Sequence, residues 1–228
     1  MKNYYKDNTP MRQPLVVTCC ISAMLLGSSF YTPSVSADSI KLHYAGFYDK
    51  LKRAQKSHHP LVDLVFSVPK KAGCLLQSGF IATEKDRFPL TYNAQQRIFV
   101  PYDSQLKSDR AQLNLTFDGD ATQCAIAMQV RVKSVKSRYS RVELFDIMQN
   151  MDTLLGSLRG FPMKHFAEPV AGVNVHFSDV NSTLRIDGVD LVPTDNPQHF
   201  IITKDQLDNK QQLQLSNTDF VMSPYIIN

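Results

Sequence analysis

The sequence lacks the short motifs that mark many catalytic and nucleotide-binding sites. It contains no H-E-x-x-H zinc motif, no C-x-x-C pair, no G-x-G-x-x-G loop and no P-loop. Two S-x-x-K patterns occur, at Ser67–Lys70 and Ser104–Lys107, but no K-T-G follows either, so we interpret both as coincidences. Adjacent His58 and His59 point to different sides on most backbones and form a poor chelate. We therefore predict no cofactor and no metal ion.

The sequence also lacks an apolar run long enough to span a bilayer. The run Leu15–Phe30 has sixteen residues and includes serines, a threonine and a glycine, whereas a spanning helix needs about 20 mostly apolar residues. The run is instead typical of an export signal, because a basic segment precedes it and Val35-Ser36-Ala37 follows as an A-x-A-like cleavage site. The basic segment contains Lys2, Lys6 and Arg12. We expect residues 1–37 to be a signal peptide that is cleaved after Ala37.

Two further questions concern this N-terminal segment. A lipid anchor needs a small residue before a cysteine at the end of the apolar run, whereas Cys19 and Cys20 lie near its start, behind Thr18, so we reject an anchor. Translation starts at either Met1 or Met11, and a signal that begins at Met11 has the more usual length. Neither start changes the predicted mature chain.

The mature chain, residues 38–228, is expected to form one domain, and it contains no second apolar segment of spanning length. The one place where it could divide into lobes is near residues 134–140. The whole sequence has a formal net charge of +4, and the predicted signal carries three basic residues and one acid, so its removal leaves +2. So small a charge gives little support to nucleic-acid binding.

Two cysteines, Cys74 and Cys124, remain after the predicted cleavage. An isolated pair in an exported protein indicates a structural disulfide, since a redox pair usually has C-x-x-C spacing and a catalytic thiol must be free. We therefore predict a Cys74–Cys124 disulfide that forms in an oxidising compartment.

The remaining pattern predicts an α+β fold with an antiparallel, β-rich body that is a sheet or resembles a sandwich. Several short segments rich in apolar and β-branched residues lie between turns, which favours antiparallel strands over a parallel βαβ design. The expected strand segments are Leu61–Pro69, Cys74–Thr83, Arg97–Asp103, Ala111–Phe117, Cys124–Val135 and several within residues 169–228. Pro224 favours an edge position for the last strand.

Two helices are predicted to pack on this body. The first is Ile40–Lys56, in which four apolar residues recur at helical spacing on one face. The second is a long amphipathic helix that starts with a capping box at Ser140 and Glu143 and ends at Gly160. Its apolar stripe indicates packing on the protein's own sheet. The stripe consists of Leu144, Ile147, Met148, Met151, Leu154, Leu155 and Leu158.

Basic residues are concentrated in two segments with few opposing acids. Their density suggests a surface that binds a polyanion, such as lipopolysaccharide or a phosphorylated polymer. The alternative is an ordinary solvated surface, which is the default for exposed charges. The candidate polyanion-binding residues are Lys50, Lys52, Arg53, Lys56, Arg131, Lys133, Lys136, Arg138 and Arg141. On a strand, Arg131 and Lys133 would share one face, and the last three would lie in a connector.

Three features of the chain resemble those of a known family. They are the export signal, the segment H-Y-A-G-F-Y-D-K-L-K-R-A (His43–Ala54) and two lone cysteines about fifty residues apart. In these features the chain resembles a family of uncharacterised envelope proteins. These are small exported proteins of Gram-negative bacteria that carry a domain of unknown function. The resemblance implies a periplasmic location. It carries over no catalytic residue, and therefore implies no activity.

Two classes of function stay open. The first is a non-enzymatic binding or interaction module that presents its surface to an envelope protein or to an anionic envelope polymer. The second is a hydrolase or transferase that acts on envelope material with residues distant in sequence. The missing motifs favour the first class. A deep pocket that holds a histidine or carboxylate of shifted pKa would favour the second.

Overall fold

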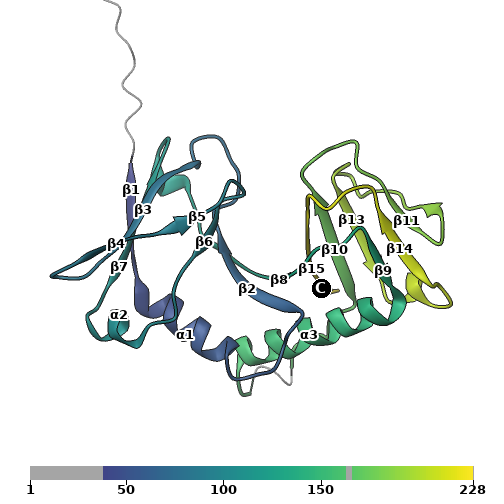
Figure 1. Cartoon of the computed structure of the whole chain (residues 1–228), viewed down its shortest axis with the longest axis horizontal. Helices are drawn as coiled ribbons and strands as arrows, with labels where there is room; N and C mark the ends of the chain where they lie inside the picture. Colours follow the sequence, from purple (N-terminus) through teal and green to yellow (C-terminus); the bar gives the residue numbers. More distant parts are fainter. Residues whose placement is uncertain (1–37, 163–165, 228) are drawn as a thin grey trace, which may run out of the picture. The chain divides into compact units, whose positions relative to one another are not determined.

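The computed structural model describes residues 38–162 and 166–227, so the predicted signal peptide lies outside the described residues. Within this part of the chain, the strands form four sheets and are accompanied by three α-helices (Figure 1). Every strand pairing is antiparallel. The predicted α+β class with an antiparallel β-rich body is confirmed.

Residues 39–132 supply two of the sheets. Sheet A has the strand order β1 (Ser39–His43), β7 (Gln112–Phe117), β3 (Leu76–Ala82) and β4 (Arg87–Pro89). Sheet B has the order β5 (Thr91–Tyr92), β6 (Arg97–Phe99), β2 (Val62–Ser67) and β8 (Ala127–Val132). The predicted disulfide is present between Cys74, just before β3, and Cys124, just before β8. It therefore joins the starts of strands from two different sheets.

Residues 138–225 supply the other two sheets. Sheet C has the order β12 (Val189–Asp190), β11 (Leu184–Ile186), β14 (Gln212–Leu215) and β9 (Arg138–Ser140). Sheet D has the order β13 (His199–Thr203), β10 (Gly172–Phe177) and β15 (Phe220–Tyr225). Strand β15, which contains Pro224, lies at an edge, as predicted.

The helices are α1 (Tyr44–Ala54), α2 (Ser104–Ser108) and α3 (Arg141–Arg159), with short 3₁₀ turns η1 (Ala121–Gln123) and η3 (Asp205–Leu207). The prediction that a helix begins at Ile40 is wrong. Residues 40–43 belong to β1, because Ile40 and Leu42 alternate with polar residues and pair with Leu115 and Leu113 of β7. Alternation with period two favours a strand, and a neighbouring strand satisfies its backbone groups.

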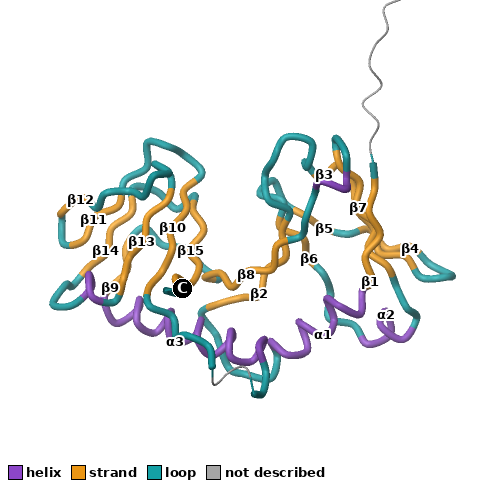
Figure 2. The backbone as a smooth tube through the Cα atoms, turned by 180° about the vertical axis from the view of Figure 1, so that it is seen from behind, coloured by secondary structure: helices purple, strands orange, loops and turns teal. Residues whose placement is uncertain are grey.

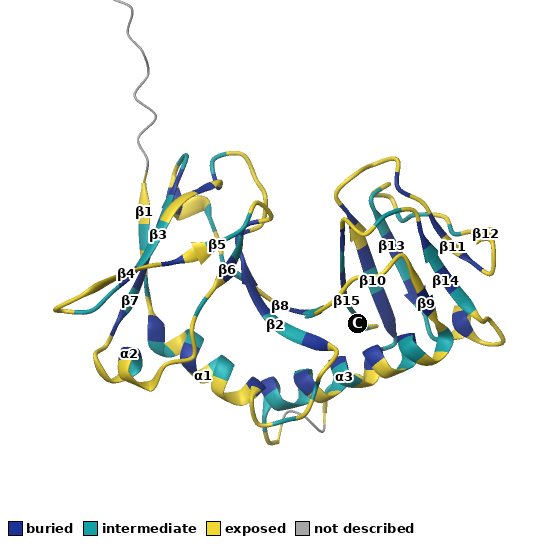
Figure 3. Cartoon of the chain, viewed as in Figure 1, coloured by how far each residue is buried: buried dark blue, intermediate teal, exposed yellow. Residues whose placement is uncertain are grey.

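Helix α3 begins with the predicted capping box. Ser140 Oγ accepts a hydrogen bond from the Glu143 backbone N, and Glu143 Oε2 accepts one from the Ser140 backbone N at 2.8 Å. The predicted stripe is buried apart from Leu155, which is half-buried. Figure 3 shows buried and exposed positions alternating along α3. Gly160 follows with φ +72°, a conformation that favours glycine. The helix packs beside sheets C and D (Figure 2).

The buried side chains form two clusters. One contains Tyr44, Phe117 and the disulfide, and draws on α1, α2 and sheet A. The other lies along α3 and draws on sheets C and D. Sheet B contributes to both, with Phe66 in the first cluster and Val130 in the second. The division of the mature chain into domains, including the boundary near residues 134–140, stays a prediction.

The capping box predicts a specific acid sensitivity. A hydrogen bond from Lys136 Nζ at 2.7 Å, followed by those from Ser140, lowers the pKa of Glu143 to about 2. A lowered pKa means that the ionised carboxylate stabilises the fold above its ordinary pKa, and that this stabilisation is lost as the pH falls toward 2. We expect the melting temperature of the wild type to fall more than that of Glu143→Gln between pH 5 and pH 2, measured by circular dichroism. Equal falls would contradict the assigned role of Glu143.

Candidate functional site

Arg131 lies in β8, opposite Asp63 of β2 in the antiparallel register. Its guanidinium does not bond to Asp63. Instead, Nε donates to Gln129 Oε1 of the same strand at 2.9 Å, and Nη2 donates to Ser67 Oγ, at the other end of β2, at 3.1 Å. The side chain is half-buried. Burial, followed by the nearby charge of Arg97, lowers the pKa of Arg131. Because an arginine stays protonated at neutral pH, this site holds a partly desolvated positive charge.

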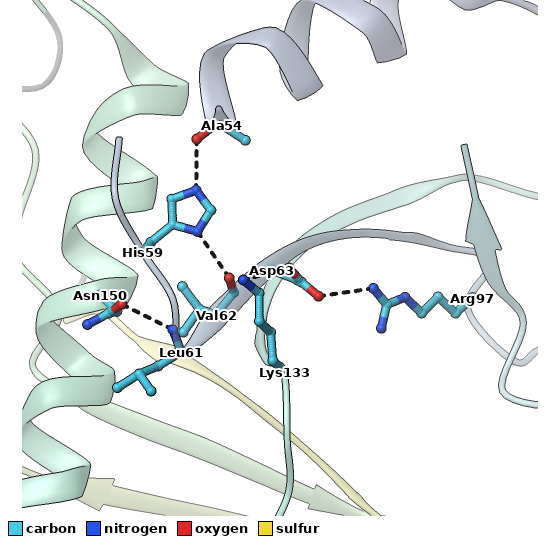
Figure 4. A network of polar contacts seen from close by, with 8 residues as sticks. All are labelled: Ala54, His59, Leu61, Val62, Asp63, Arg97, Lys133 and Asn150. Atoms are coloured by element: carbon cyan, nitrogen blue, oxygen red, sulfur yellow. Dashed lines mark hydrogen bonds and ion pairs between the residues drawn. The ribbon is translucent and has the colours of Figure 1, made fainter. Parts of the chain in front are cut away.

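The carboxylate of Asp63 is shared by two other cations (Figure 4). Arg97 Nη2 lies 3.4 Å from Asp63 Oδ2, and Lys133 Nζ lies 3.5 Å from Asp63 Oδ1. Within residues 38–162 and 166–227, Arg131 makes no ion pair with a carboxylate. This face of sheet B therefore carries an excess of positive charge around a single carboxylate.

Arg131 lines a cavity of about 420 Å³. Some of the lining comes from β2, β8 and the segment after β2, and the rest includes residues of β10 and β15. The polar and basic lining residues are Ser67, Lys70, Gln95, Gln129, Arg131, His176, Ser178 and Gln198. None of the described residues that line it is an aspartate or a glutamate. The cavity, called the Arg131 cavity below, therefore combines two cations with several neutral hydrogen-bonding groups.

His176 is the one histidine among the described lining residues of this cavity. Burial, followed by the charge of His199, lowers the pKa of His176. The neighbouring His199 is held by Asn174 Oδ1 at 3.0 Å and Thr194 Oγ1 at 3.2 Å. Among the described residues, His176 makes no hydrogen bond to a serine, threonine or carboxylate. The cavity thus holds an imidazole of lowered pKa that, among the described residues, makes no hydrogen bond to a nucleophile.

The other predicted basic residues do not converge on the Arg131 cavity. Three of them are paired with carboxylates: Lys133 with Asp63, Lys136 with Glu143 at 2.7 Å, and Arg141 with Asp208 at 3.4 Å. Four others are exposed, namely Lys52, Arg53, Lys56 and Arg138. Of these, Arg53 donates from Nη1 to Leu158 O at 3.1 Å. Lys50 lines a separate apolar cavity. Contrary to the expected connector, Arg138 lies in β9 and Arg141 opens α3. Polyanion binding by the full set stays a prediction.

The two S-x-x-K patterns do not form serine–lysine pairs in the structure. Ser67 Oγ accepts a hydrogen bond from Arg131. Ser104 opens the short helix α2, which places Lys107 one turn away, but Lys107 Nζ binds Asp49 at 2.7 Å and lies over the ring of Tyr48. Among the described residues, neither lysine is hydrogen-bonded to the serine of its pattern.

The ring of His59 connects the end of α1 to the start of β2 (Figure 4). Its Nε2 lies 2.7 Å from Ala54 O, and its Nδ1 lies 3.0 Å from Val62 O. Nearby, the Leu61 backbone N donates to Asn150 Oδ1 of α3 at 3.2 Å. Both ring nitrogens of His59 are thus engaged in structural contacts.

Sequence reasoning named Arg131 for its charge but missed the cavity around it. His176 is exposed on β10, yet it also lines the cavity. Lys70 was considered only as part of an S-x-x-K pattern. The alternation of Gln129 and Arg131 in β8 could have indicated a shared face, but the strands brought beside that face cannot be read from local patterns.

In residues 38–162 and 166–227, no group of three or more histidine, cysteine, aspartate or glutamate side chains is arranged to hold a metal ion. In the same part of the chain, no helix has both the length and the apolar character needed to cross a bilayer.

Neither the curated proteins nor the solved structures include one with significant similarity to this chain. One family model matches residues 36–177, a range that includes Ser67, Arg131 and His176. This match confirms the resemblance to an uncharacterised family. The chain therefore belongs to the family described as "Protein of unknown function (DUF2987)".

Proposed function

We propose that this protein is an exported, non-enzymatic envelope protein that binds an anionic ligand in the Arg131 cavity. The observation that carries this proposal is the half-buried guanidinium of Arg131, which faces a cavity of about 420 Å³ and has no carboxylate partner among the described residues. The only carboxylate opposite it in the register, Asp63, is occupied by Arg97 and Lys133.

Removing a charge from water costs free energy unless a counter-ion compensates it. The hydrogen bonds of Arg131 to Gln129 and Ser67 replace only part of the hydration that its half-buried guanidinium loses. An anion that enters the cavity would restore this lost interaction and form charge-assisted hydrogen bonds, which are about twice as strong as neutral ones. Lys70, at the same cavity, adds a second positive charge.

The disulfide supports the proposed location outside the cytoplasm. Disulfides persist in oxidising compartments such as the bacterial periplasm, and the Cys74–Cys124 bond is of the structural kind that joins two sheets. Together with the N-terminal segment typical of an export signal, it favours a periplasmic protein that meets envelope material. A cleavage after Ala37 remains part of this proposal.

A second candidate function is hydrolysis or group transfer on envelope material. It is favoured by His176, whose lowered pKa would keep the imidazole available as a general base at neutral pH. The absence of a hydrogen bond from His176 to a nucleophile among the described residues favours the binding role instead.

Retention on envelope material tests the proposal. The wild type, Arg131→Gln and the matched control Arg87→Gln, which removes an exposed arginine of β4, are passed over immobilised host envelope extract at low salt. We expect the wild type and the control to be retained equally, and Arg131→Gln to bind about tenfold more weakly, because a charge-assisted pair contributes about 1.5–3 kcal/mol. Circular dichroism checks that Arg131→Gln is folded.

Two results would overturn the proposal. Equal retention of all three proteins would show that the cavity does not bind the retained material. Turnover of an envelope substrate that His176→Ala abolishes would replace the binding role with the enzymatic one.

A further inference from the structure

We propose that the ligand of the Arg131 cavity is an acidic sugar, a hydroxyl-rich ring that carries one carboxylate or one phosphate group. This inference rests on the proposed function, since it names the chemical class of the anion bound there. It is drawn from three features of the cavity: the hydrogen-bonding groups left over on Arg131, the neutral polar lining and the size.

The first feature is the anchor for the anionic group. Arg131 uses Nε and Nη2 to bond Gln129 and Ser67, which fixes the plane of the guanidinium. Within the described part of the chain, its Nη1 makes no hydrogen bond, so its two hydrogens remain for a ligand oxygen. An arginine held in this way offers Nη1 as a charged hydrogen-bond donor to a carboxylate or phosphate oxygen. Arg131 and Lys70 are the two basic side chains among the described residues that line the cavity, so both can attract an anionic group bound there.

The second feature is the neutral polar lining. Besides the two cations, the cavity is lined by three glutamines and two serines, namely Gln95, Gln129, Gln198, Ser67 and Ser178. An amide or a hydroxyl both donates and accepts hydrogen bonds, as does each hydroxyl of a sugar. Gln198 uses Nε2 to donate to Ser178 O at 2.7 Å, which leaves its Oε1 for a ligand hydroxyl. A simple inorganic anion or an apolar acid offers this lining fewer hydroxyl groups than a sugar does.

The third feature is size. A volume of about 420 Å³ falls within the roughly 300–1,000 Å³ of small-molecule sites. Pro69 and Val221 add apolar surface against which the C–H groups of a ring can pack. These dimensions suit one sugar unit or a short oligosaccharide end, and they do not suit a long polymer segment.

Isothermal titration with small probes tests the inference on the full mature protein. The probes are glucuronate and glucose 6-phosphate as acidic sugars, glucose as the neutral sugar, and acetate and inorganic phosphate as the anions without a sugar. We expect at least one acidic sugar to bind at least tenfold more tightly than glucose and than its matching simple anion. Arg131→Gln should weaken that binding about tenfold or more, while Arg87→Gln, at an exposed arginine outside the cavity, should leave it unchanged. Preference for glucuronate or for glucose 6-phosphate identifies the anionic group.

The outcomes separate this inference from the proposed function. If acetate or phosphate binds as tightly as the matching acidic sugar, the sugar inference is overturned and anion binding stands. If no probe binds, but retention on envelope extract still depends on Arg131, the sugar inference is overturned alone. If neither the binding of the probes nor the retention on envelope extract depends on Arg131, both proposals are overturned. Binding of glucose as tight as that of the acidic sugars overturns the role of the charge.

Discussion

Replacing Gly172 by alanine is expected to destabilise the protein by about 3 kcal/mol, at the upper end of the usual range for an overpacked site. Gly172 opens β10, the central strand of sheet D, and is paired with Thr203 on one side and Tyr225 on the other. An added Cβ would lie 2.8 Å from Thr203 Cα and closer still to the carbonyl oxygen of Ile202. Both are backbone atoms, so no side-chain rotation relieves the clash, and the strand itself must shift.

A matched variant at Gly156 separates the steric clash at Gly172 from the general effect of replacing a glycine by alanine. Gly156 lies inside α3, and an added Cβ there meets nothing within 4 Å. Alanine is favoured over glycine in helix interiors, so Gly156→Ala should stabilise the protein by about 0.5–1 kcal/mol. Urea unfolding of both variants provides the comparison. If Gly172→Ala stays within 0.5 kcal/mol of the wild type, the close approach of β10 and β13 is wrong.

The opposite signs expected for Gly156 and Gly172 illustrate what the sequence can and cannot predict. Helix α3 was predictable because its determinants are local: the capping box at Ser140 and Glu143, the apolar stripe, and the glycine at its end all lie within one segment. The demand for glycine at position 172 comes from Ile202 and Thr203, about thirty residues further along the chain. No local pattern contains that information, because it depends on which strands pair and in which register.

Strand β1 and helix α2 show the same limit at the level of elements. Ile40–His43 was absorbed into the predicted helix because the apolar positions of α1 continue the spacing backwards, and only pairing with β7 shows a strand. Helix α2 has five residues, with Asp103 as its N-cap accepting from the Gln105 backbone N. So short a helix has no measurable periodicity, and its packing on α1 through Leu106 and Lys107 holds it in place.

The candidate site was the least predictable part, for a reason that concerns charge. Nine basic residues stood out equally in the sequence, yet they differ in the partners that the fold provides. Lys133, Lys136 and Arg141 each find a carboxylate. Arg131 does not, because Asp63, directly opposite, is held by Arg97 from β6 and Lys133 from the end of β8. The sequence shows how many basic residues a segment contains. The excess of positive charge around Asp63 depends on the register of β2 against β8, which the sequence does not show.

Reduction of the Cys74–Cys124 disulfide is expected to destabilise the protein by about 4 kcal/mol, the value that loop-closure entropy gives for cysteines 50 residues apart. Because typical domains are stable by about 5–15 kcal/mol, this is a large share of the total. The residues between the two cysteines include β3, β4, β5, β6 and β7, so the bond limits the freedom of most of sheet A and part of sheet B in the unfolded chain.

Guanidinium unfolding of the oxidised and the reduced wild type measures this effect without changing any side chain. The double variant Cys74→Ala/Cys124→Ala is the control, because its stability should not respond to reductant. It should be less stable than the reduced wild type, since Cys74 is only 2% exposed and alanine leaves a small cavity in its place. A reduced wild type as stable as the oxidised one would contradict a structural role for the bond.

The size of this effect connects the fold to the compartment in which the protein works. A chain that loses about 4 kcal/mol when reduced is close to unfolding wherever thiols are kept reduced. The side chains of the Arg131 cavity would suffer first from loosening of sheet B, because β8 follows Cys124 directly and presents both Arg131 and Gln129. We therefore expect the reduced protein to lose Arg131-dependent retention on envelope extract at a guanidinium concentration that leaves the oxidised protein's retention intact. Parallel loss in both forms would show that the cavity does not depend on the disulfide.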